Sequence, residues 1–297
     1  MKKLSILSIS LMLFAFVACD QTDAESDMED LATSQAVASL DLSTEESMEA
    51  SYDDIDLLTE AGMDMLGLSL KDGGRLEGFR RGWDRRDRAL DCAAIEKDTV
   101  NQIITIDFGD GCEGPHGVVR KGKIIIEYNG RRYAAGSYRE VTLEDFYLDS
   151  VKVEGSRRTE VVSADSTTIV VNATTTDGKL IFPDETFATR DADHTRTIVR
   201  GDEEDGDYST LSGSAEGVKR DGTDYSVTIL EDLLFKRGCW AGRGFIPVAG
   251  VKEIVNGEST AVIDYGDGTC DNEVEITIDG ETTTKTIEPR GRKRRRG

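Results

Sequence analysis

Between residues 100 and 287, apolar and polar residues alternate along most of the chain. The alternation is clear in NQIITIDF, GKIIIEYNG, STTIVVNA and VEITIDG, and turn-forming residues recur every eight to twelve positions. A period of two predicts β-strands with one buried face. No helical pattern of ten residues interrupts the series, so parallel βαβ units are excluded. We therefore predict a mainly β fold, an antiparallel meander that forms a sandwich or a curved, partly open barrel.

Three dipeptides mark turns between these strands: Asn129-Gly130, Asp221-Gly222 and Asp279-Gly280. Asn-Gly and Asp-Gly favour the positive φ angles of tight turns. We expect two-residue hairpin turns at 129–130 and at 279–280.

The period changes to that of a helix over residues 43–66. Met48, Tyr52, Ile55 and Leu58 recur on one helical face, Ser43 and Glu46 have the spacing of a capping box, and Gly67 is a plausible stop. We predict one N-terminal helical segment within residues 43–70, packed on the β domain through its apolar stripe. The alternative is a helix that binds a partner.

The first residues have the pattern of a secretory signal peptide, residues 1–18. Lys2 and Lys3 precede an apolar run that is too short to span a membrane as a helix. The end of the run, Phe16-Val17-Ala18-Cys19, resembles the lipobox of bacterial lipoproteins, although Leu is usual at the position of Phe16. This resemblance implies that Cys19 is lipidated, so that the membrane is a partner through an N-terminal lipid. The alternative is a plain signal peptide followed by an incidental cysteine.

The charge is strongly acidic and unevenly spread. The chain carries −22, or −24 once Lys2 and Lys3 leave with the signal peptide, and residues 20–65 hold 15 Asp or Glu and no Lys or Arg. Such a body repels phosphates, so we expect no nucleic-acid partner. Residues 19–42 have little apolar surface to bury and are predicted to form a disordered acidic tether. Acidic residues soon after the cysteine also resemble the surface-export signal of Bacteroidota lipoproteins, which implies an outer-membrane, surface-exposed location. An Asp directly after the cysteine, as at Asp20, is instead associated with inner-membrane retention in enteric bacteria.

Two segments of this acidic chain are instead strongly basic. Six arginines crowd between residues 75 and 88, and six basic residues occupy the last eight positions, 290–297. The arginine cluster suits anionic glycans or phosphate, or it pairs with the chain's own acids. The tail, residues 289–297, suits anionic lipopolysaccharide or the acidic leader, or it is a solvated disordered end.

Two related segments each carry a pair of cysteines. The first runs from Cys92 to Cys112, the second from Cys239 to Cys270, and both contain Ile-Asp-aromatic-Gly-Asp-Gly beside the second cysteine. With Cys19 lipidated, four cysteines remain and allow three pairings. The repeat favours disulfides 92–112 and 239–270. A four-cysteine zinc site would need short spacings such as CxxC, which are absent.

The aspartates of these motifs have two interpretations. Carboxylates around glycines supply the hard oxygen ligands that Ca²⁺ prefers, which makes calcium the one cofactor to consider. The alternative is a tight turn in which each Asp accepts hydrogen bonds from its own backbone. The absence of full EF-hand spacing favours the turn. The calcium candidates are Asp107, Asp110, Asp264, Asp267 and Asp271.

Taken together, the lipobox, the acidic leader and the paired C…IDFGDGC and C…IDYGDGTCD segments resemble a group of Bacteroidota cell-envelope lipoproteins. The resemblance covers most of the mature chain. It implies a β-rich fold and an envelope location, and it brings no activity and no catalytic residues.

No catalytic motif is present. His116 and His194 are the only histidines, both flanked by loop-like residues, and there is no G-x-S-x-G, HExxH, Walker or G-x-G-x-x-G motif. The expected organisation is signal peptide (1–18), tether (19–42), helical segment (43–70), β domain (71–288) and basic tail (289–297). We expect a lipid-anchored envelope protein with a binding or structural role. The alternative is a carbohydrate-active accessory protein or enzyme that uses paired carboxylates, although the sequence does not locate such a pair.

Overall fold

Strands dominate the computed structural model, which describes residues 43–65, 90–114, 117–131, 133–201, 206–240 and 246–286. These residues also form helix α2 (Ser43–Met65) and a short 3-10 helix, η3 (Arg237–Trp240). The strands are β1 (Ala94–Asp98), β2 (Ile103–Asp107), β3 (Cys112–Glu113), β4 (Val119–Asn129), β5 (Tyr138–Leu148), β6 (Val151–Ala164), β7 (Thr168–Ile181), β8 (Phe187–Val199), β9 (Tyr208–Val218), β10 (Asp224–Lys236), β11 (Ala249–Asn256), β12 (Ser259–Asp267), β13 (Glu273–Ile278) and β14 (Glu281–Thr286).

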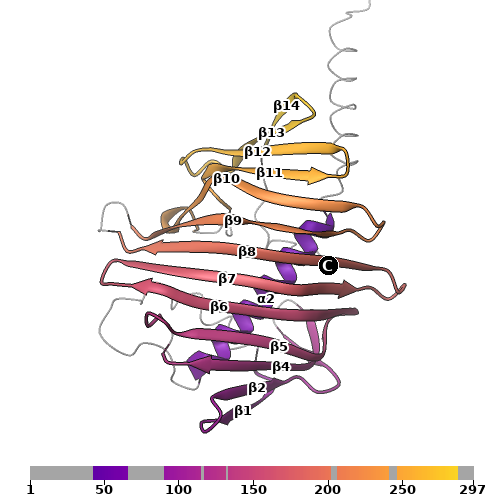
Figure 1. Cartoon of the computed structure of the whole chain (residues 1–297), viewed down its shortest axis with the longest axis vertical. Coiled ribbons are helices and arrows are strands. Elements are labelled where there is room, and N and C mark those ends of the chain that lie inside the picture. Colours follow the sequence, from indigo (N-terminus) through magenta and orange to yellow (C-terminus); the bar gives the residue numbers. More distant parts are fainter. Residues whose placement is uncertain are drawn as a thin grey trace, which may run out of the picture. The chain divides into compact units, whose positions relative to one another are not determined.

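All fourteen strands belong to one antiparallel sheet, and their order in the sheet follows the sequence (Figure 1). The short β3 pairs with β4 beside this path. The predicted mainly β meander with one N-terminal helix is therefore confirmed. The sheet is not closed into a barrel, and in the described part of the chain a helix, rather than a second sheet, packs on it.

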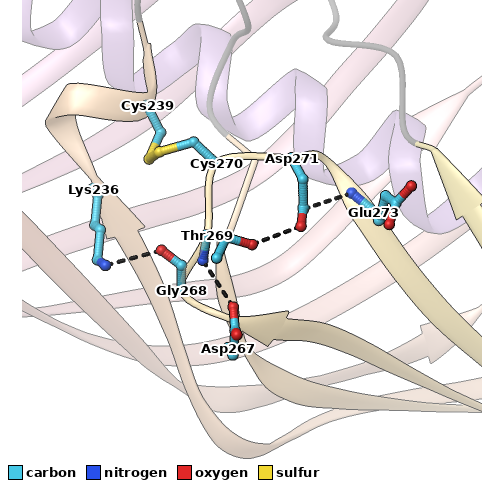
Figure 2. The surroundings of a disulfide bond; sticks show 8 residues. All are labelled: Lys236, Cys239, Asp267, Gly268, Thr269, Cys270, Asp271 and Glu273. Carbon is cyan, nitrogen blue, oxygen red and sulfur yellow. Dashed lines mark hydrogen bonds between the residues drawn. A yellow bond between two sulfur atoms is a disulfide. The ribbon is translucent and has the colours of Figure 1, made fainter.

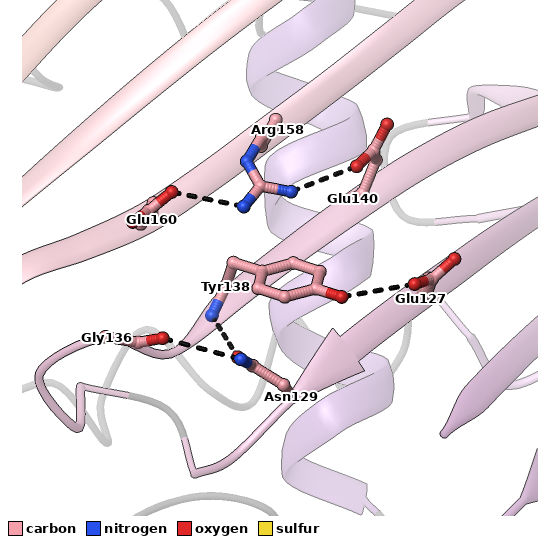
Figure 3. Close-up of polar contacts among 7 residues, drawn as sticks. All are labelled: Glu127, Asn129, Gly136, Tyr138, Glu140, Arg158 and Glu160. Carbon is pink, nitrogen blue, oxygen red and sulfur yellow. Dashed lines mark hydrogen bonds and ion pairs between the residues drawn. The ribbon is translucent and has the colours of Figure 1, made fainter. Parts of the chain in front are cut away.

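The turn signals have different outcomes. Asp279 and Gly280 have positive φ angles of 48° and 95° and join β13 to β14 as a two-residue turn, as predicted. The prediction for Asn129-Gly130 is wrong, because Asn129 pairs with Tyr138 and the connection between them is longer. The Asn129 side chain accepts a hydrogen bond from the Tyr138 amide at 2.6 Å and donates to the Gly136 carbonyl, so it closes this loop (Figure 3).

Helix α2 packs on the sheet through the predicted stripe. Met48, Ile55 and Leu58 are completely buried, and they share one core with the isoleucines of β2 and β4. Figure 1 shows the helix crossing the strands on one side of the sheet. The apolar stripe is therefore covered by the chain itself, as expected for the packed rather than the partner-binding helix. The side chains of Ser43 and Glu46 lie outside the described residues, so the capping box stays a prediction.

The two faces of the sheet differ because successive side chains point to opposite sides. On β6, Arg157 points toward α2 while Arg158 lies on the other face. Arg158 bonds Glu140 and Glu160 and stacks over the Tyr138 ring, 4.1 Å from its centroid (Figure 3). These charged side chains on the face opposite the helix therefore have partners on that face.

Candidate functional site

The cysteine motifs form the two disulfides predicted from the repeat. Cys92 pairs with Cys112 and Cys239 with Cys270, with Cα–Cα distances of 5.6 and 5.4 Å. Figure 2 shows the second bridge beside the end of β12. Both motifs therefore have a structural role, in which a disulfide covalently closes a segment of the chain.

The aspartates around these bridges hold turns. Asp107 and Asp264 each accept a hydrogen bond at 2.8 Å from the amide two residues later. Asp267 bonds the Thr269 amide, and Asp271 bonds both the Thr269 hydroxyl and the Glu273 amide (Figure 2). Across the described ranges, no three or more His, Cys, Asp or Glu side chains gather in a way that suits a metal ion. The geometry thus supports the turn interpretation for these four residues and offers no support for calcium at them or at Asp110.

Several predicted features lie outside the described residues. These are Cys19, the arginine cluster at 75–88, His116 and the basic tail at 289–297. They stay predictions.

A cavity of about 190 Å³ lies between α2 and strands β5 to β9. Its helix wall carries Glu49, Asp53, Asp56 and Glu60, which share one flank of α2 because they are spaced four, three and four residues apart. Its sheet wall carries Arg139, Arg157, Arg190, Arg196 and His194, and the apolar lining between them includes Val141, Val171, Ala173, Ala192, Ile198 and Leu211. The site is therefore bipolar, with an acidic wall from the helix and a basic wall from the sheet.

Some of these charges already have partners. Arg157 donates to both carboxylate oxygens of Asp56, at 3.3 and 2.9 Å, and to the Thr175 hydroxyl at 2.9 Å. Arg190 lies 3.6 Å from Glu45, and Arg196 donates to the Ser209 hydroxyl at 3.2 Å. These contacts attach α2 to β6 and β8.

Other polar groups of the cavity are left unsatisfied. Four buried side-chain atoms in the described part of the chain have no hydrogen-bond partner, and three of them belong to residues that line this cavity. The three are Thr59 Oγ1, Arg139 Nη1 and Arg190 Nη1, of which Arg190 Nη1 is the atom in the 3.6 Å ion pair with Glu45, and the fourth is Arg120 Nη1. Native proteins satisfy almost all buried polar atoms, so this concentration points to groups that a ligand or water would bond.

Two titratable groups of the cavity have shifted pKa values. Asp53 lines the cavity, and its side chain reaches solvent although many protein atoms lie around it. Desolvation by these atoms, reinforced by Glu49 and Asp56, raises the pKa of Asp53 from 3.8 to about 6. Burial, together with Arg190 and Arg157, lowers the pKa of His194 from 6.5 to about 4. His194 is therefore neutral at pH 7, while Asp53 changes its charge near pH 6.

We expect the Asp53→Asn variant to reveal this shift as a pH-dependent difference in stability. Because the native carboxyl binds its proton more tightly than the unfolded one, Asp53 costs stability as the pH rises from about 4 to about 6. The variant should match the wild type near pH 3.5 and be the more stable of the two at pH 7.5, with a gain limited by the exposure of Asp53 to solvent. Urea unfolding of both proteins across this range measures the difference. His194 has the opposite slope over the same window, but it is common to both proteins and cancels.

Comparisons of this chain with protein-family models, curated proteins and solved structures find no match.

The sequence interpretation missed this cavity. The prediction that His194 lies among loop residues is wrong, because it sits in the middle of β8 and faces α2. A signal was present, since Arg190, His194 and Arg196 fall on the same alternate positions as Ala192 and Ile198. An inward-facing row of charges on a central strand requires partners, and the acidic flank of α2 supplies them.

Proposed function

We propose that this chain is a lipid-anchored cell-envelope protein that binds a small polar ligand in the cavity beneath α2, without a catalytic step. The observation that carries the binding role is the presence of two buried polar atoms, Thr59 Oγ1 and Arg139 Nη1, that belong to residues lining one cavity and have no hydrogen-bond partner. A buried donor or acceptor that lacks a hydrogen bond costs about 1–3 kcal/mol of stability, so a ligand that bonds these atoms gains affinity from each.

The size of the cavity suits a small molecule. Its volume of about 190 Å³ exceeds the roughly 150 Å³ that accommodates benzene in an engineered apolar cavity. Its polar walls favour a charged or hydrogen-bonding ligand over a purely apolar one.

The binding role is tested by filling the cavity. Ala173 lines it from β7, and the next residue, Thr174, points to the opposite face of the same strand. We expect Ala173→Leu to abolish binding in a calorimetric screen of small carboxylic acids, amines and amino acids, while Thr174→Leu retains it. If no compound in the screen binds, or if both variants bind equally, the cavity is not the ligand site.

The envelope location rests on the first twenty residues. The lipobox-like end at Cys19 and the acidic residues after it support an anchor in the outer membrane with the domain at the cell surface. Among the residues that the structure describes, no helix has the length and apolar character to cross a membrane. The basic residues 290–297 would add salt-sensitive attraction to lipopolysaccharide.

We expect Cys19→Ala to abolish labelling of the protein by a fatty-acid analogue and to release it from membranes. The physical reason is that acyl chains supply the anchor, at about 0.8 kcal/mol per buried methylene. The double variant Cys92→Ala/Cys112→Ala is the matched control and should be labelled normally, because those sulfurs form a disulfide. Normal labelling of Cys19→Ala would remove the lipoprotein assignment.

A second function has one observation in its favour. Asp53 holds its proton up to about pH 6, while Asp56, three residues later, is ion-paired to Arg157. Two carboxyl groups in one site, one of which has a raised pKa, are the pattern of acid catalysis in glycoside hydrolases. A carbohydrate-active enzyme would lose turnover of a chromogenic glycoside in both Asp53→Asn and Asp56→Asn, whereas the binding protein that we propose turns over none in any form.

A further inference from the structure

Two groups of polar side chains in the cavity lining differ in exposure and in charge. The first is Thr59, which is only 3% exposed, with the buried Nη1 group of Arg139, and neither Thr59 Oγ1 nor Arg139 Nη1 has a hydrogen-bond partner. Arg139 also lines a small adjoining pocket with Met63. Thr59 lies one helical turn before Met63 on the same face of α2, and Thr59 and Arg139 both line the 190 Å³ cavity.

Thr59 and Arg139 are hydrogen-bond donors that suit an oxyanion. A guanidinium N–H and a hydroxyl both donate hydrogen bonds, and a carboxylate accepts from several donors at once. The charged hydrogen bond from Arg139 would be strong because the site is largely shielded from water.

The second group is acidic and favours a cation instead. Asp53 is exposed, Glu49 and Asp56 lie on the same helix flank, and Arg157 and Arg196 offset part of their charge. The mutual repulsion of these three carboxylates would be relieved by a positively charged group beside Asp53.

The lining between these two groups is mixed. Val141, Val171, Ala173 and Ala192 contribute apolar surface, and the ion-paired Asp56 and Arg157 line the same cavity. Asp53 and Thr59 are six residues apart on α2, which at 1.5 Å per residue separates them by about 9 Å along the helix axis. A ligand that reaches both groups therefore needs several methylene groups, or a peptide unit, between its charged groups.

Resting on the binding role proposed above, we propose that the cavity selects a zwitterion with widely separated charges, such as an ω-amino acid or a dipeptide. Its carboxylate would accept hydrogen bonds from Arg139 and Thr59, and its ammonium group would pair with the exposed Asp53. The two charges of the ligand then match the two walls, whereas a simple anion would meet the acidic flank of α2 uncompensated and a simple amine would leave Arg139 and Thr59 unsatisfied.

Titration calorimetry of the full-length protein at pH 7.5 tests this selectivity with four probes. The probes are 6-aminohexanoate, hexanoate, hexylamine and glycine. Hexanoate carries only the negative charge, hexylamine carries only the positive charge, and glycine carries both charges at a short spacing. We expect 6-aminohexanoate to bind at least tenfold more tightly than each of the other three. Asp53→Asn should remove the preference for 6-aminohexanoate over hexanoate, and Arg139→Gln should remove its preference over hexylamine.

Arg158→Gln is the matched control, because Arg158 lies on the opposite face of the sheet in an exposed ion-pair cluster. It should leave all four affinities unchanged. Circular dichroism melting of each variant confirms that lost binding does not reflect lost folding.

The outcomes separate this inference from the binding role on which it rests. Equal affinity for hexanoate and 6-aminohexanoate, or tighter binding of glycine, overturns the zwitterion proposal and leaves a ligand cavity that Ala173→Leu still blocks. Failure of all four probes overturns the zwitterion proposal too. The binding role falls only if, in addition, the wider screen finds no ligand that depends on the cavity.

Discussion

Replacing Asp54 by alanine is expected to lower the free energy of unfolding by about 3–5 kcal/mol. Asp54 on α2 accepts two hydrogen bonds from Arg120 on β4, from Nε at 2.8 Å and from Nη2 at 2.5 Å. The Arg120 side chain is only 4% exposed, so loss of its partner leaves a buried cation without compensation. Urea denaturation followed by circular dichroism measures the loss.

A double variant shows whether the stability is lost because Arg120 remains as an unpaired buried charge or because the ion pair itself is gone. Asp54→Leu/Arg120→Met replaces both charges with apolar side chains, and it should recover most of the stability that Asp54→Ala loses, because the desolvated charge is gone. The exposed pair Arg220–Asp184 is a matched control in which removal of the carboxylate should cost less than about 1 kcal/mol. A loss of that small size at Asp54 would contradict the structural role given to this pair.

Loss of either disulfide is expected to destabilise the fold by about 3 kcal/mol. Each bridge closes a short loop, because the paired cysteines are 20 positions apart in one and 31 in the other, and both therefore restrict the unfolded chain to a similar degree. We expect Cys92→Ala/Cys112→Ala and Cys239→Ala/Cys270→Ala to lower the melting temperature by similar amounts. The bridges lie near opposite ends of the strand order, so their effects should add within about 0.5 kcal/mol when combined.

Peptide mapping of the oxidised protein checks the premise of that experiment. It should recover Cys92 linked to Cys112, and Cys239 linked to Cys270. Mixed linkages, or a combined loss much larger than the sum, would show that the two motifs depend on each other.

Local patterns were sufficient to predict the elements of this fold. The period of two across residues 100–287 and the stripe formed by Met48, Tyr52, Ile55 and Leu58 depend only on neighbours in the sequence, and both were correct. Whether the sheet closes was not readable, because closure depends on the register between strands far apart in the sequence. The Asn129-Gly130 turn failed for a local reason, since the Asn129 side chain bonds the backbone across a longer loop.

The cavity required information that no local pattern contains. Arg157 and Asp56 are 101 positions apart in the sequence. Tyr52 donates a hydrogen bond to the carbonyl of Glu154, which is 102 positions away in the sequence. Alternation along β8 places its arginines and His194 on the buried face, but it does not identify the element that covers them. The acidic residues of α2 were visible only as part of a general excess of acid.

The order of the cysteines has a consequence for how the chain matures. Each disulfide joins a cysteine to the next one along the sequence, and each strand of the main path pairs with the one before it. A chain that crosses a membrane N-terminus first can therefore be oxidised in the order in which its thiols emerge, with no need for later reshuffling. Cys19 is the exception, because a free thiol there would pair first with Cys92 and shift every later partner by one. Acylation of Cys19, as proposed above, would remove this thiol, and oxidation of the remaining four cysteines would then follow their order in the sequence.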